Sequence, residues 1–513
     1  MHSPLFDKFR IFFARRIAII IFLVLYVSVA LAVYKDFGAS FDEFMVYTRG
    51  DYFYHKVVGN DPYLQKGFVV RDTDNYVLHY YNSTYPALLY AINDSQSYET
   101  YHLLNILFGS IIFIALYETL LVTYKKWYYA ILGPVLLLLV PRFLGHIPAN
   151  PKDVPFATAY MATLFVILIR RSLSPFLRVL LLGFFIGITV SLRFVGFTLV
   201  IIYFVFMLFD IAQKKEMIKQ VWEAILESII ISALSFAVLM TSLPYIGADP
   251  YNHTIELLKV NKNYPWLGTM RFFGKSYTKD SFPLLYTPLW ILISTPVSIL
   301  LLSTIGFVRS FFGKINKLQL LVLISLIVQS FFYFILKPFV YNGVRHYLFI
   351  LPHLVLLVII AIVSIKKYAR LFKALVAFLI IDACFIIFMY IQLHPYEYTY
   401  FNPIVHLGYD VDRDFDFDYW AASDRKSLEW LKNNTIQAAP KIFMCSDSPS
   451  LQIYYPEAID VNKSIHSSDY IICNDNGMLE KILKNSSAKI IYQEKKGNII
   501  YNTVLKNNST PSF

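Results

Sequence analysis

Residues 17–34 read IAIIIFLVLYVSVALAVY and contain no charged side chain. A helix needs roughly 20 predominantly apolar residues to cross the hydrocarbon core of a bilayer, and this run comes close to that length. It follows a basic stretch, residues 1–16, and ends in Val33-Tyr34-Lys35 instead of the small residues that mark a signal-peptide cleavage site. We therefore predict a retained membrane-spanning helix whose basic flank stays in the cytoplasm.

Ten further apolar runs follow, so the fold class that we expect is a polytopic α-helical membrane protein with about eleven spans. These runs cover approximately residues 101–124, 127–141, 154–169, 179–192, 195–211, 226–244, 284–307, 318–336, 347–365 and 374–393.

The composition agrees with this class. Charged residues make up 16% of the 513 positions and hydrophobic residues 57%, which is unlike a soluble globular protein. The net charge of +11 could indicate nucleic-acid binding, but most Lys and Arg residues lie at the ends of apolar runs, where they act as topology signals. Cytosolic enzymes and nucleic-acid binders are therefore excluded.

Clusters of Lys and Arg mark alternate connections between the runs. They lie within residues 125–126, 170–178, 214–219, 309–317 and 366–373. Basic clusters favour the cytoplasmic side of a membrane, whereas the remaining short connections carry only scattered basic residues. The pattern predicts a cytoplasmic N-terminus and a C-terminus on the outer side.

Three segments are too polar for the membrane, and all fall on the predicted outer side: residues 35–100, 247–282 and 394–513. We expect residues 1–393 to form a transmembrane domain with the first two segments as its outer loops. Residues 394–513 should form a small separate α/β domain, because a helical stretch alternates with short apolar runs. The stretch is Ser427–Asn433, and the runs are Lys441–Cys445, Tyr470–Cys473, Ile490–Gln493 and a hairpin-like Gly497–Leu505.

The three cysteines are too few for a disulfide framework or a metal cluster. A single disulfide bridge between Cys445 and Cys473 remains an alternative. The acid-rich segment Asp410–Trp420 suggests calcium, but Phe415 and Ala421 stand where an EF-hand needs Gly and Glu. A solvated acidic strand or an undefined cation site remains there, so we predict no defined metal site and leave a divalent cation open.

The adjacent carboxylates Asp42 and Glu43 follow the first run directly. Neighbouring carboxylates raise each other's pKa, and one of them can act as a general base. The alternative is an acidic start of an interfacial helix near Phe41, which the dipeptide alone favours.

A second polar group lies in residues 141–155, before the fourth span. It contains five residues with functional side chains: Arg142, His146, Asn150, Lys152 and Asp153. Four prolines in the segment predict a backbone that departs from ordinary helix, as is tolerated where it lines a cavity. The cations could donate to phosphate and Asp153 could position a hydroxyl; alternatively, the segment is a solvated turn in which Asp153 caps the next helix.

Two further sites carry cations at the outer boundary. Arg345 and His346 precede the tenth span, where they can bind phosphate and transfer a proton, unless Arg345 merely extends to the interface. Arg193 lies between the fifth and sixth spans and binds either an anion or an outer carboxylate. The aromatic segment His394–Pro403 fits an interfacial belt, and no ligand spacing supports zinc at His394.

The combination of Asp42-Glu43, Asn150–Phe156 and Asn342–His346 resembles GT-C type membrane glycosyltransferases. It is most similar to the branch of protein O-mannosyltransferase-like and aminoarabinose-transferase-like enzymes that use lipid-phosphate sugar donors. The segment His394–Tyr398, together with Asp418–Trp420 and Glu429–Leu431, is similar to a related bacterial subgroup. The resemblance covers roughly residues 10–435.

The resemblance implies an inverting transfer of a sugar from a polyprenyl-phosphate carrier to a hydroxyl of a glycan, lipid or protein. The membrane would be a bacterial plasma membrane, with the site on its extracytoplasmic face. Asp42 corresponds to the base, whose pKa we expect Glu43 and burial to raise, and Asp153 to a second acid. Donor-phosphate residues map onto Lys152, Arg193, Arg345 and His346, with Arg142, His146 and Asn150 as further candidates. A β-trefoil repeat is missing from residues 247–282, which puts a protein acceptor in doubt.

The rival class is a transporter or flippase for a lipid-linked or anionic substrate, with Arg193, Arg345 and Asp153 along its pathway. The polar boundary residues concentrate on one face, and no inverted repeat is visible, which favours the enzyme. A membrane scaffold whose outer domain binds a partner is a third possibility.

Overall fold

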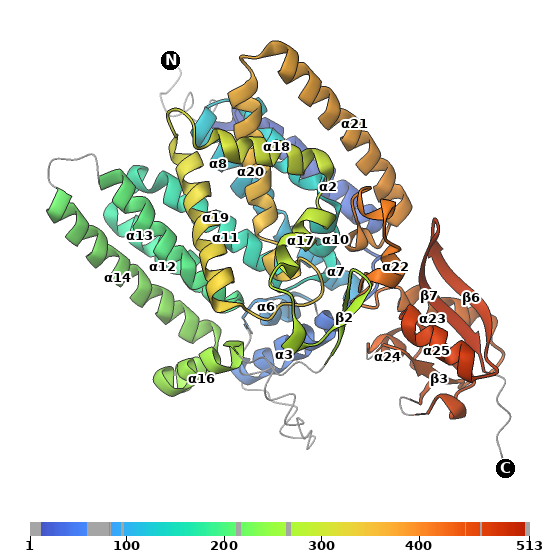
Figure 1. Cartoon of the computed structure of the whole chain (residues 1–513). Coiled ribbons are helices and arrows are strands. Elements are labelled where there is room, and N and C mark those ends of the chain that lie inside the picture. The colour runs from blue at the N-terminus through green and yellow to red at the C-terminus, as the bar shows by residue number, and fades with distance from the viewer. Residues whose placement is uncertain are drawn as a thin grey trace, which may run out of the picture.

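The computed structural model describes residues 12–58, 82, 84–93, 97–211, 217–262, 268–446, 448–461 and 464–507. A large helical region is followed by a small C-terminal region that contains a sheet (Figure 1). The apolar helices and helix pairs are α2 (Ile17–Val33), α7 (Tyr98–Gly109) with α8 (Ile111–Tyr124), α9 (Trp127–Leu138) with α10 (Pro141–Ala149), α11 (Asp153–Ile169), α12 (Pro175–Leu192), α13 (Thr198–Ile211), α14 (Met217–Ser242), α17 (Tyr286–Ser294) with α18 (Val297–Arg309), α19 (Lys317–Leu336), α20 (Ile350–Ile365) and α21 (Ala369–Leu393).

Seven helices of the described residues are long and apolar enough to cross a membrane. The pairs α9–α10 and α17–α18 are bent by 74° and 119° and add one span each if each pair crosses as a unit. The helices α2 and α20 are apolar but shorter, at 17 and 16 residues. Each of the eleven predicted runs overlaps one of these helices or pairs, so the multi-pass helical class is confirmed; the count of eleven and the orientation stay predictions.

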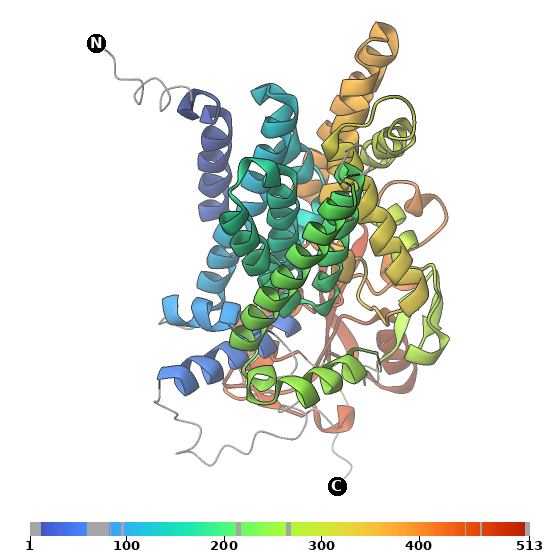
Figure 2. The ribbon, with the colours of Figure 1, turned by 90° about the vertical axis from the view of Figure 1, so that its left-hand side faces the viewer.

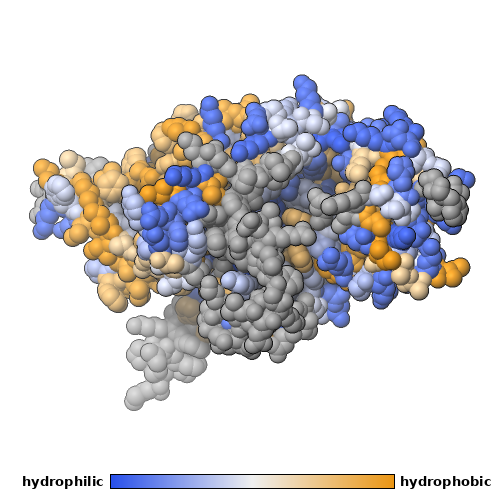
Figure 3. All heavy atoms as spheres, turned by 90° about the horizontal axis from the view of Figure 1, so that it is seen from below, coloured by the Kyte–Doolittle hydropathy of each residue, from blue (hydrophilic) through white to orange (hydrophobic). Residues whose placement is uncertain are grey.

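The described parts of the three polar segments gather at one end of the apolar helices. Helices α3 (Phe41–Val58) and α16 (Pro250–Lys262) lie across that end (Figure 2). Helix α6 (Thr84–Ile92) packs against α3, and a hairpin of β1 (Met270–Phe272) and β2 (Lys275–Tyr277) follows α16. Viewed from below, hydrophobic side chains cover much of the side formed by α13 and α14, whereas hydrophilic ones predominate over the C-terminal region (Figure 3).

The C-terminal region has the expected α/β structure. Its five-stranded sheet has the order β4-β3-β5-β7-β6, with β3 parallel to β4 and β5, and β7 antiparallel to β5 and β6. A disulfide joins Cys445 to Cys473 beside the paired strands β3 and β5, so the bridge that the sequence left open is present. The elements are α23 (Asp424–Asn434), β3 (Lys441–Met444), α24 (Ser450–Tyr454), β4 (Ile459–Asp460), β5 (Tyr470–Cys473), α25 (Asn476–Asn485), β6 (Lys489–Lys496) and β7 (Ile499–Lys506).

The segment after α21 packs inside the protein. Tyr396, Tyr398 and Tyr400 are 1%, 3% and 0% exposed, so the prediction of an interfacial aromatic belt is wrong. The reason is close packing between this segment and α10: a Cβ at Gly145 would lie 2.2 Å from the Tyr398 nitrogen. Side chains up to Ala422, together with Tyr501 of β7, share the apolar core of the helical region, whereas the separate C-terminal clusters begin at Leu428. The domain boundary at residues 393 and 394 stays a prediction.

Two side chains satisfy the backbone at the 119° bend between α17 and α18. Asp382 accepts a hydrogen bond from the Ser298 N–H at the start of α18, at 2.9 Å. The Asn402 side chain donates to the carbonyls of Leu292 and Thr295, at 2.7 and 3.1 Å. A break inside a membrane-embedded bundle needs such partners, because lipid offers none.

We expect Asp382→Ala to lower the free energy of unfolding by about 1–3 kcal/mol, because it leaves the buried Ser298 N–H without its acceptor. Asp382→Asn keeps an acceptor oxygen and should cost less. Thermal unfolding of the purified protein in detergent measures both variants. Equal melting temperatures for Asp382→Ala and the unmodified chain would refute this role.

Candidate functional site

The segment of residues 141–155 is mostly helical, which corrects the prediction of a non-helical backbone. Pro141 is the first residue of α10 and Pro155 lies in the first turn of α11, where a helix does not need the missing N–H. Pro148 lies near the end of α10, and Pro151 lies in the short link to α11. The prolines therefore lie at the ends of two helices that a short link joins, and residues 150–153 lie at this junction.

Helix α3 begins with a capping box. The Glu43 carboxylate accepts from the Ser40 N–H at 2.8 Å, while the Ser40 hydroxyl accepts from the Glu43 N–H at 3.2 Å. Glu43 is fully buried and also contacts Tyr47 and His102, at 3.2 and 3.0 Å. The interpretation of the acidic pair as the start of a helix therefore holds for Glu43. Through its contact with His102, Glu43 also anchors α3 to α7.

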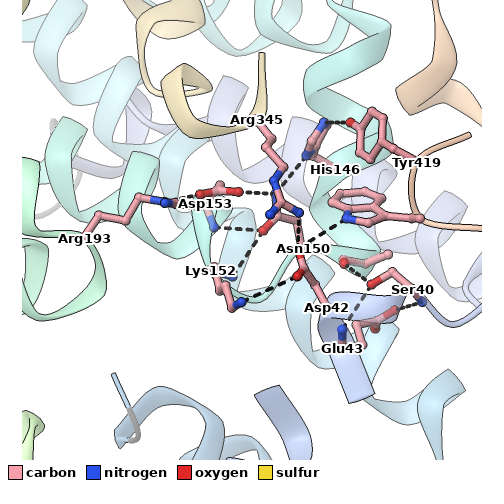
Figure 4. A network of polar contacts seen from close by, with 12 residues as sticks. Ser40, Asp42, Glu43, His146, Asn150, Lys152, Asp153, Arg193, Arg345 and Tyr419 are labelled. Atoms are coloured by element: carbon pink, nitrogen blue, oxygen red, sulfur yellow. Dashed lines mark hydrogen bonds and ion pairs between the residues drawn. The ribbon is translucent and has the colours of Figure 1, made fainter. Parts of the chain in front are cut away.

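Asp42 points into a different cluster (Figure 4). Its carboxylate forms an ion pair with Arg345, lies 3.5 Å from the Lys152 ammonium and accepts from the Trp420 indole at 3.3 Å. These partners come from the residues before α20, from the junction before α11 and from the segment after α21. Asp42 is only 7% exposed, so a charge network closes around it at one end of the bundle.

The expected rise in the pKa of Asp42 is wrong. Burial alone would raise it, but the Arg345 guanidinium and the Lys152 ammonium outweigh burial and hold the pKa of Asp42 well below its usual range. Asp42 is therefore a carboxylate at every physiological pH, and its strength as a base depends on where those two cations are.

Asp153 forms the second half of the cluster. It forms an ion pair with Arg193, which lies between α12 and the short helix η2 (Phe194–Phe197). The Asn150 side chain donates to the other Asp153 oxygen at 2.9 Å, and its own oxygen accepts from the Asp153 N–H at 2.9 Å. The sequence left open whether Arg193 binds an anion or a carboxylate of the protein, and the structure shows the carboxylate of Asp153.

His146 continues the network from Asn150 toward the C-terminal segment. Its Nδ1 accepts from the Asn150 amide at 2.8 Å, so the proton of the neutral ring lies on Nε2. Nε2 lies 3.0 Å from the Tyr419 hydroxyl, and the ring packs edge-on against Trp420 with 4.7 Å between ring centroids. The network thus fixes the orientation of His146.

Two predicted residues have other surroundings. Arg142 is fully buried and donates to the Tyr400 carbonyl at 2.8 Å, and its guanidinium lies over the adjoining rings of Trp290 and Phe401, which is a packing role. Burial, together with the cations Arg193 and Arg345, lowers the pKa of His346 well below its ordinary value. His346 is therefore neutral and can contact phosphate only as a hydrogen-bond donor or acceptor.

The segment of residues 410–420 is not a solvated acidic strand, because it is folded into the protein. It contains the short helix α22 (Val411–Asp414), and Asp418 is 5% exposed. Asp418 accepts from the hydroxyls of Tyr398 and Ser423 and from the Ala422 N–H. This turn, in which Ala421 has a φ of 55°, holds Trp420 against Asp42. Among the described residues, no group of three or more His, Cys, Asp or Glu side chains could hold a metal ion.

Sequence reasoning missed Trp420 and Tyr419 as site residues, because only the subgroup resemblance drew attention to them. It also missed Arg49, a 1% exposed cation in α3 that lies near Lys152 around a small cavity. The available signal was a charge two turns after Asp42 on the same amphipathic helix.

No protein-family model and no curated protein matches the chain. Among solved structures, ArnT from Cupriavidus metallidurans bound to undecaprenyl phosphate aligns with a TM-score of 0.50 and 10% identity, over 95% of this chain and 98% of that chain. The chain has the fold of GT-C type membrane glycosyltransferases. The apo state of the same ArnT aligns with a TM-score of 0.48 and 11% identity, over the same shares. The mycobacterial arabinofuranosyltransferase AftD aligns with a TM-score of 0.37 and 10% identity, over 84% of this chain and 37% of that chain.

Behind the Asp418 turn, Asp424 gives a prediction for stability against pH. Burial raises the pKa of Asp424 to about 7, although Ser446 and Asn502 donate to it. Between roughly pH 4 and 7 the folded protein therefore keeps a proton that the unfolded chain has released. This contribution is present at acid pH and is lost as the pH rises through 7. In unfolding experiments from pH 5 to 8, Asp424→Asn should lose less stability than the unmodified chain. Parallel curves would argue against a buried, protonated Asp424.

Proposed function

We propose that this protein transfers a sugar from a polyprenyl-phosphate carrier to a hydroxyl acceptor, with inversion, on the extracytoplasmic face of a bacterial plasma membrane. The observation that carries the proposal is the buried Asp42 carboxylate with Arg345 and Lys152 at one end of the apolar helices. A carrier with a prenyl tail cannot leave the membrane, so its phosphate and a base must meet at such a boundary. The fold shared with ArnT, of which a structure contains undecaprenyl phosphate, supports this carrier class.

In the proposed reaction, Asp42 takes the proton of an acceptor hydroxyl. The hydroxyl oxygen attacks the anomeric carbon from the side opposite the phosphate and forms the new glycosidic bond. The bond between that carbon and the phosphate oxygen breaks, and its electron pair leaves with the polyprenyl phosphate. Lys152 and Arg345 stabilise the negative charge that develops on this leaving group.

The same two cations link donor binding to the strength of the base. In the free protein they lower the pKa of Asp42, which makes it a weak base. A donor phosphate competes for their positive charge, so each cation that turns toward phosphate raises the pKa of Asp42. Asp42 thus becomes an effective base when a donor is present.

The remaining residues have supporting roles in this proposal. Asp153, the second acid, holds Arg193 and, through Asn150, orients His146. Glu43 fixes the start of α3 and with it the position of Asp42. This chemistry requires only a hydroxyl of the acceptor, whether the acceptor is a glycan, a lipid or a protein.

A transporter or flippase for a lipid-linked or anionic substrate is the second candidate. The bent pairs α9–α10 and α17–α18 favour it, because discontinuous helices often line transport sites. However, the ionisable cluster of Asp42, Lys152, Asp153, Arg193 and Arg345 is confined to one end of the bundle, which suits a boundary reaction better than a path.

Replacing Asp42 with Asn should reduce transfer by about 10²–10⁴-fold, because the general base is lost. Binding of undecaprenyl phosphate should stay or tighten, because the substitution frees the charge of Arg345 and Lys152. The measurement uses membranes supplied with polyprenyl-phosphate sugars labelled in the sugar, and it follows release of the carrier and labelling of the acceptor. Asp410→Asn, on an exposed carboxylate, is the control. Turnover by Asp42→Asn at the control rate would rule out Asp42 as the base, and movement of labelled donor across the membrane without release would favour the transporter.

Binding of the carrier phosphate should weaken as the pH rises from 7 to 9. Burial lowers the pKa of Lys152 to about 8, although Asp42 opposes this, so the ammonium is lost above that pH. A phosphate monoester has its second pKa at about 6 and therefore keeps its negative charge from pH 7 to 9. Titration of undecaprenyl phosphate binding against pH should show this loss, and Lys152→Arg should remove it because Arg stays charged. The same pH profile in both proteins would exclude Lys152 as the titrating group.

A further inference from the structure

An exposed apolar turn, residues 402–409, follows the buried aromatic segment after α21. Its sequence is NPIVHLGY, without Asp, Glu, Lys or Arg, and it contains the short helix η6 (Val405–Leu407). Ile404, Leu407 and Tyr409 are 60%, 87% and 42% exposed, whereas Val405 is 5% exposed and belongs to the apolar core. Single exposed apolar residues are common on protein surfaces, but three within one short uncharged turn mark an interaction surface.

The apolar turn has a fixed conformation. Because a 3₁₀-helix has three residues per turn, Ile404 and Leu407 lie on the same side of η6, while Val405 points into the core. Several backbone N–H groups donate to carbonyls within the turn, namely those of Val405, Leu407, Gly408 and Tyr409. A segment whose N–H groups are satisfied in this way can enter a layer that is poor in water.

The apolar turn begins beside helices that are apolar and long enough to cross a membrane. The Asn402 N–H donates to the Ile293 carbonyl at 2.9 Å, at the bend between α17 and α18, and the neighbouring Leu292 is exposed. Helix α21 ends at Leu393, shortly before the turn, and leaves most of its apolar stretch exposed. Such outward apolar side chains of a membrane helix face lipid. The turn therefore continues a lipid-facing surface, and the exposed Asp410 marks its end.

Positive charge lies close to the same end of α21, at the tip of the hairpin of β6 and β7 (Figure 1). The Lys496 ammonium lies 5.8 Å from the centre of the Tyr396 ring, which stacks on Tyr501 of β7 at 4.5 Å. Residues 495–498 contain two Lys and no acid, and Lys495 is exposed. Basic side chains at a membrane surface are attracted to anionic lipid head groups.

We propose that the apolar turn and the tip of the β6–β7 hairpin form a surface that binds the phospholipid bilayer. The turn enters the leaflet beside α21, with Tyr409 at the interfacial level that tyrosine favours. Lys495 and Lys496 contact anionic head groups. This contact holds the C-terminal region against the membrane and sets the depth of the segment that continues to Trp420. It goes beyond the proposed function and does not depend on sugar transfer.

The test measures the surroundings of a nitroxide spin label on the purified full-length protein, in nanodiscs that contain anionic lipid. Cys384 is replaced by Ser, and the Cys445–Cys473 disulfide does not react with the label. The control position is the exposed Ile436, which precedes β3 at the end of the sheet opposite the hairpin tip. A label at Leu407→Cys should be readily accessible to oxygen and several-fold less accessible to the water-soluble complex Ni-EDDA than a label at Ile436→Cys.

The two reagents distinguish what covers the apolar turn. Equal access of Ni-EDDA to the labels at Leu407→Cys and Ile436→Cys shows that the turn lies in water and overturns the inference. Low access of both oxygen and Ni-EDDA at Leu407→Cys shows contact with a protein partner or a second copy of the chain, and overturns it as well. If Leu407→Cys fails to fold, Ile404→Cys places the label on the same side of η6.

A lipid whose anionic head group chelates Ni²⁺ tests the hairpin tip. This lipid should relax a label at Asn498→Cys, next to the two lysines, several-fold more strongly than a label at Ile436→Cys. Replacing both lysines, with Lys495→Gln and Lys496→Gln, should lower the relaxation at Asn498→Cys because the attraction to the head group is lost. Equal relaxation at the tip and at Ile436→Cys, or no effect of the lysine substitutions, would remove the hairpin from the bilayer-binding surface.

Discussion

The arrangement of one end of the helical region depends on one buried carboxylate. Asp42 is 7% exposed at one end of the apolar helices, where an unpaired buried charge is costly, and it is stabilised by Arg345, Lys152 and the Trp420 indole. Each partner belongs to a different part of the chain. The ion pairs therefore fix the relative positions of α3, the junction before α11 and the segment before α20.

The helical scaffold and the C-terminal segment support this cluster from opposite sides. The capping box of Ser40 and Glu43 sets the first turn of α3, and Asn150 sets the junction that carries Lys152. On the other side, the buried Asp418 holds the turn that presents Trp420. The C-terminal segment is thus part of the site's wall as well as the link to the small α/β region.

Local properties of the sequence predicted much of the fold. Apolar length identifies membrane helices without knowledge of their partners, and alternation with turns identified β3, β5 and part of β6. The segment Gly497–Leu505, expected to be hairpin-like, instead lies mostly in the single strand β7. Ionisable residue types at the ends of apolar runs likewise selected Asp42, Lys152, Asp153, Arg193 and Arg345.

What the sequence could not supply was the pairing among these ionisable residues. Trp420 reaches Asp42 across 378 positions and Arg345 across 303, so the sign of the pKa change at Asp42 was wrong. The prolines in residues 141–155 led to the wrong prediction of a non-helical backbone. A proline that begins a helix looks the same in sequence as one that breaks a helix.

The most direct test of this account is a structure of the protein with undecaprenyl phosphate bound. The account predicts the phosphate next to the Asp42 carboxylate, in contact with Lys152 and Arg345, with the prenyl chain leaving between apolar helices. A phosphate bound away from this cluster, at the opposite end of the bundle or within the C-terminal α/β region, would contradict it.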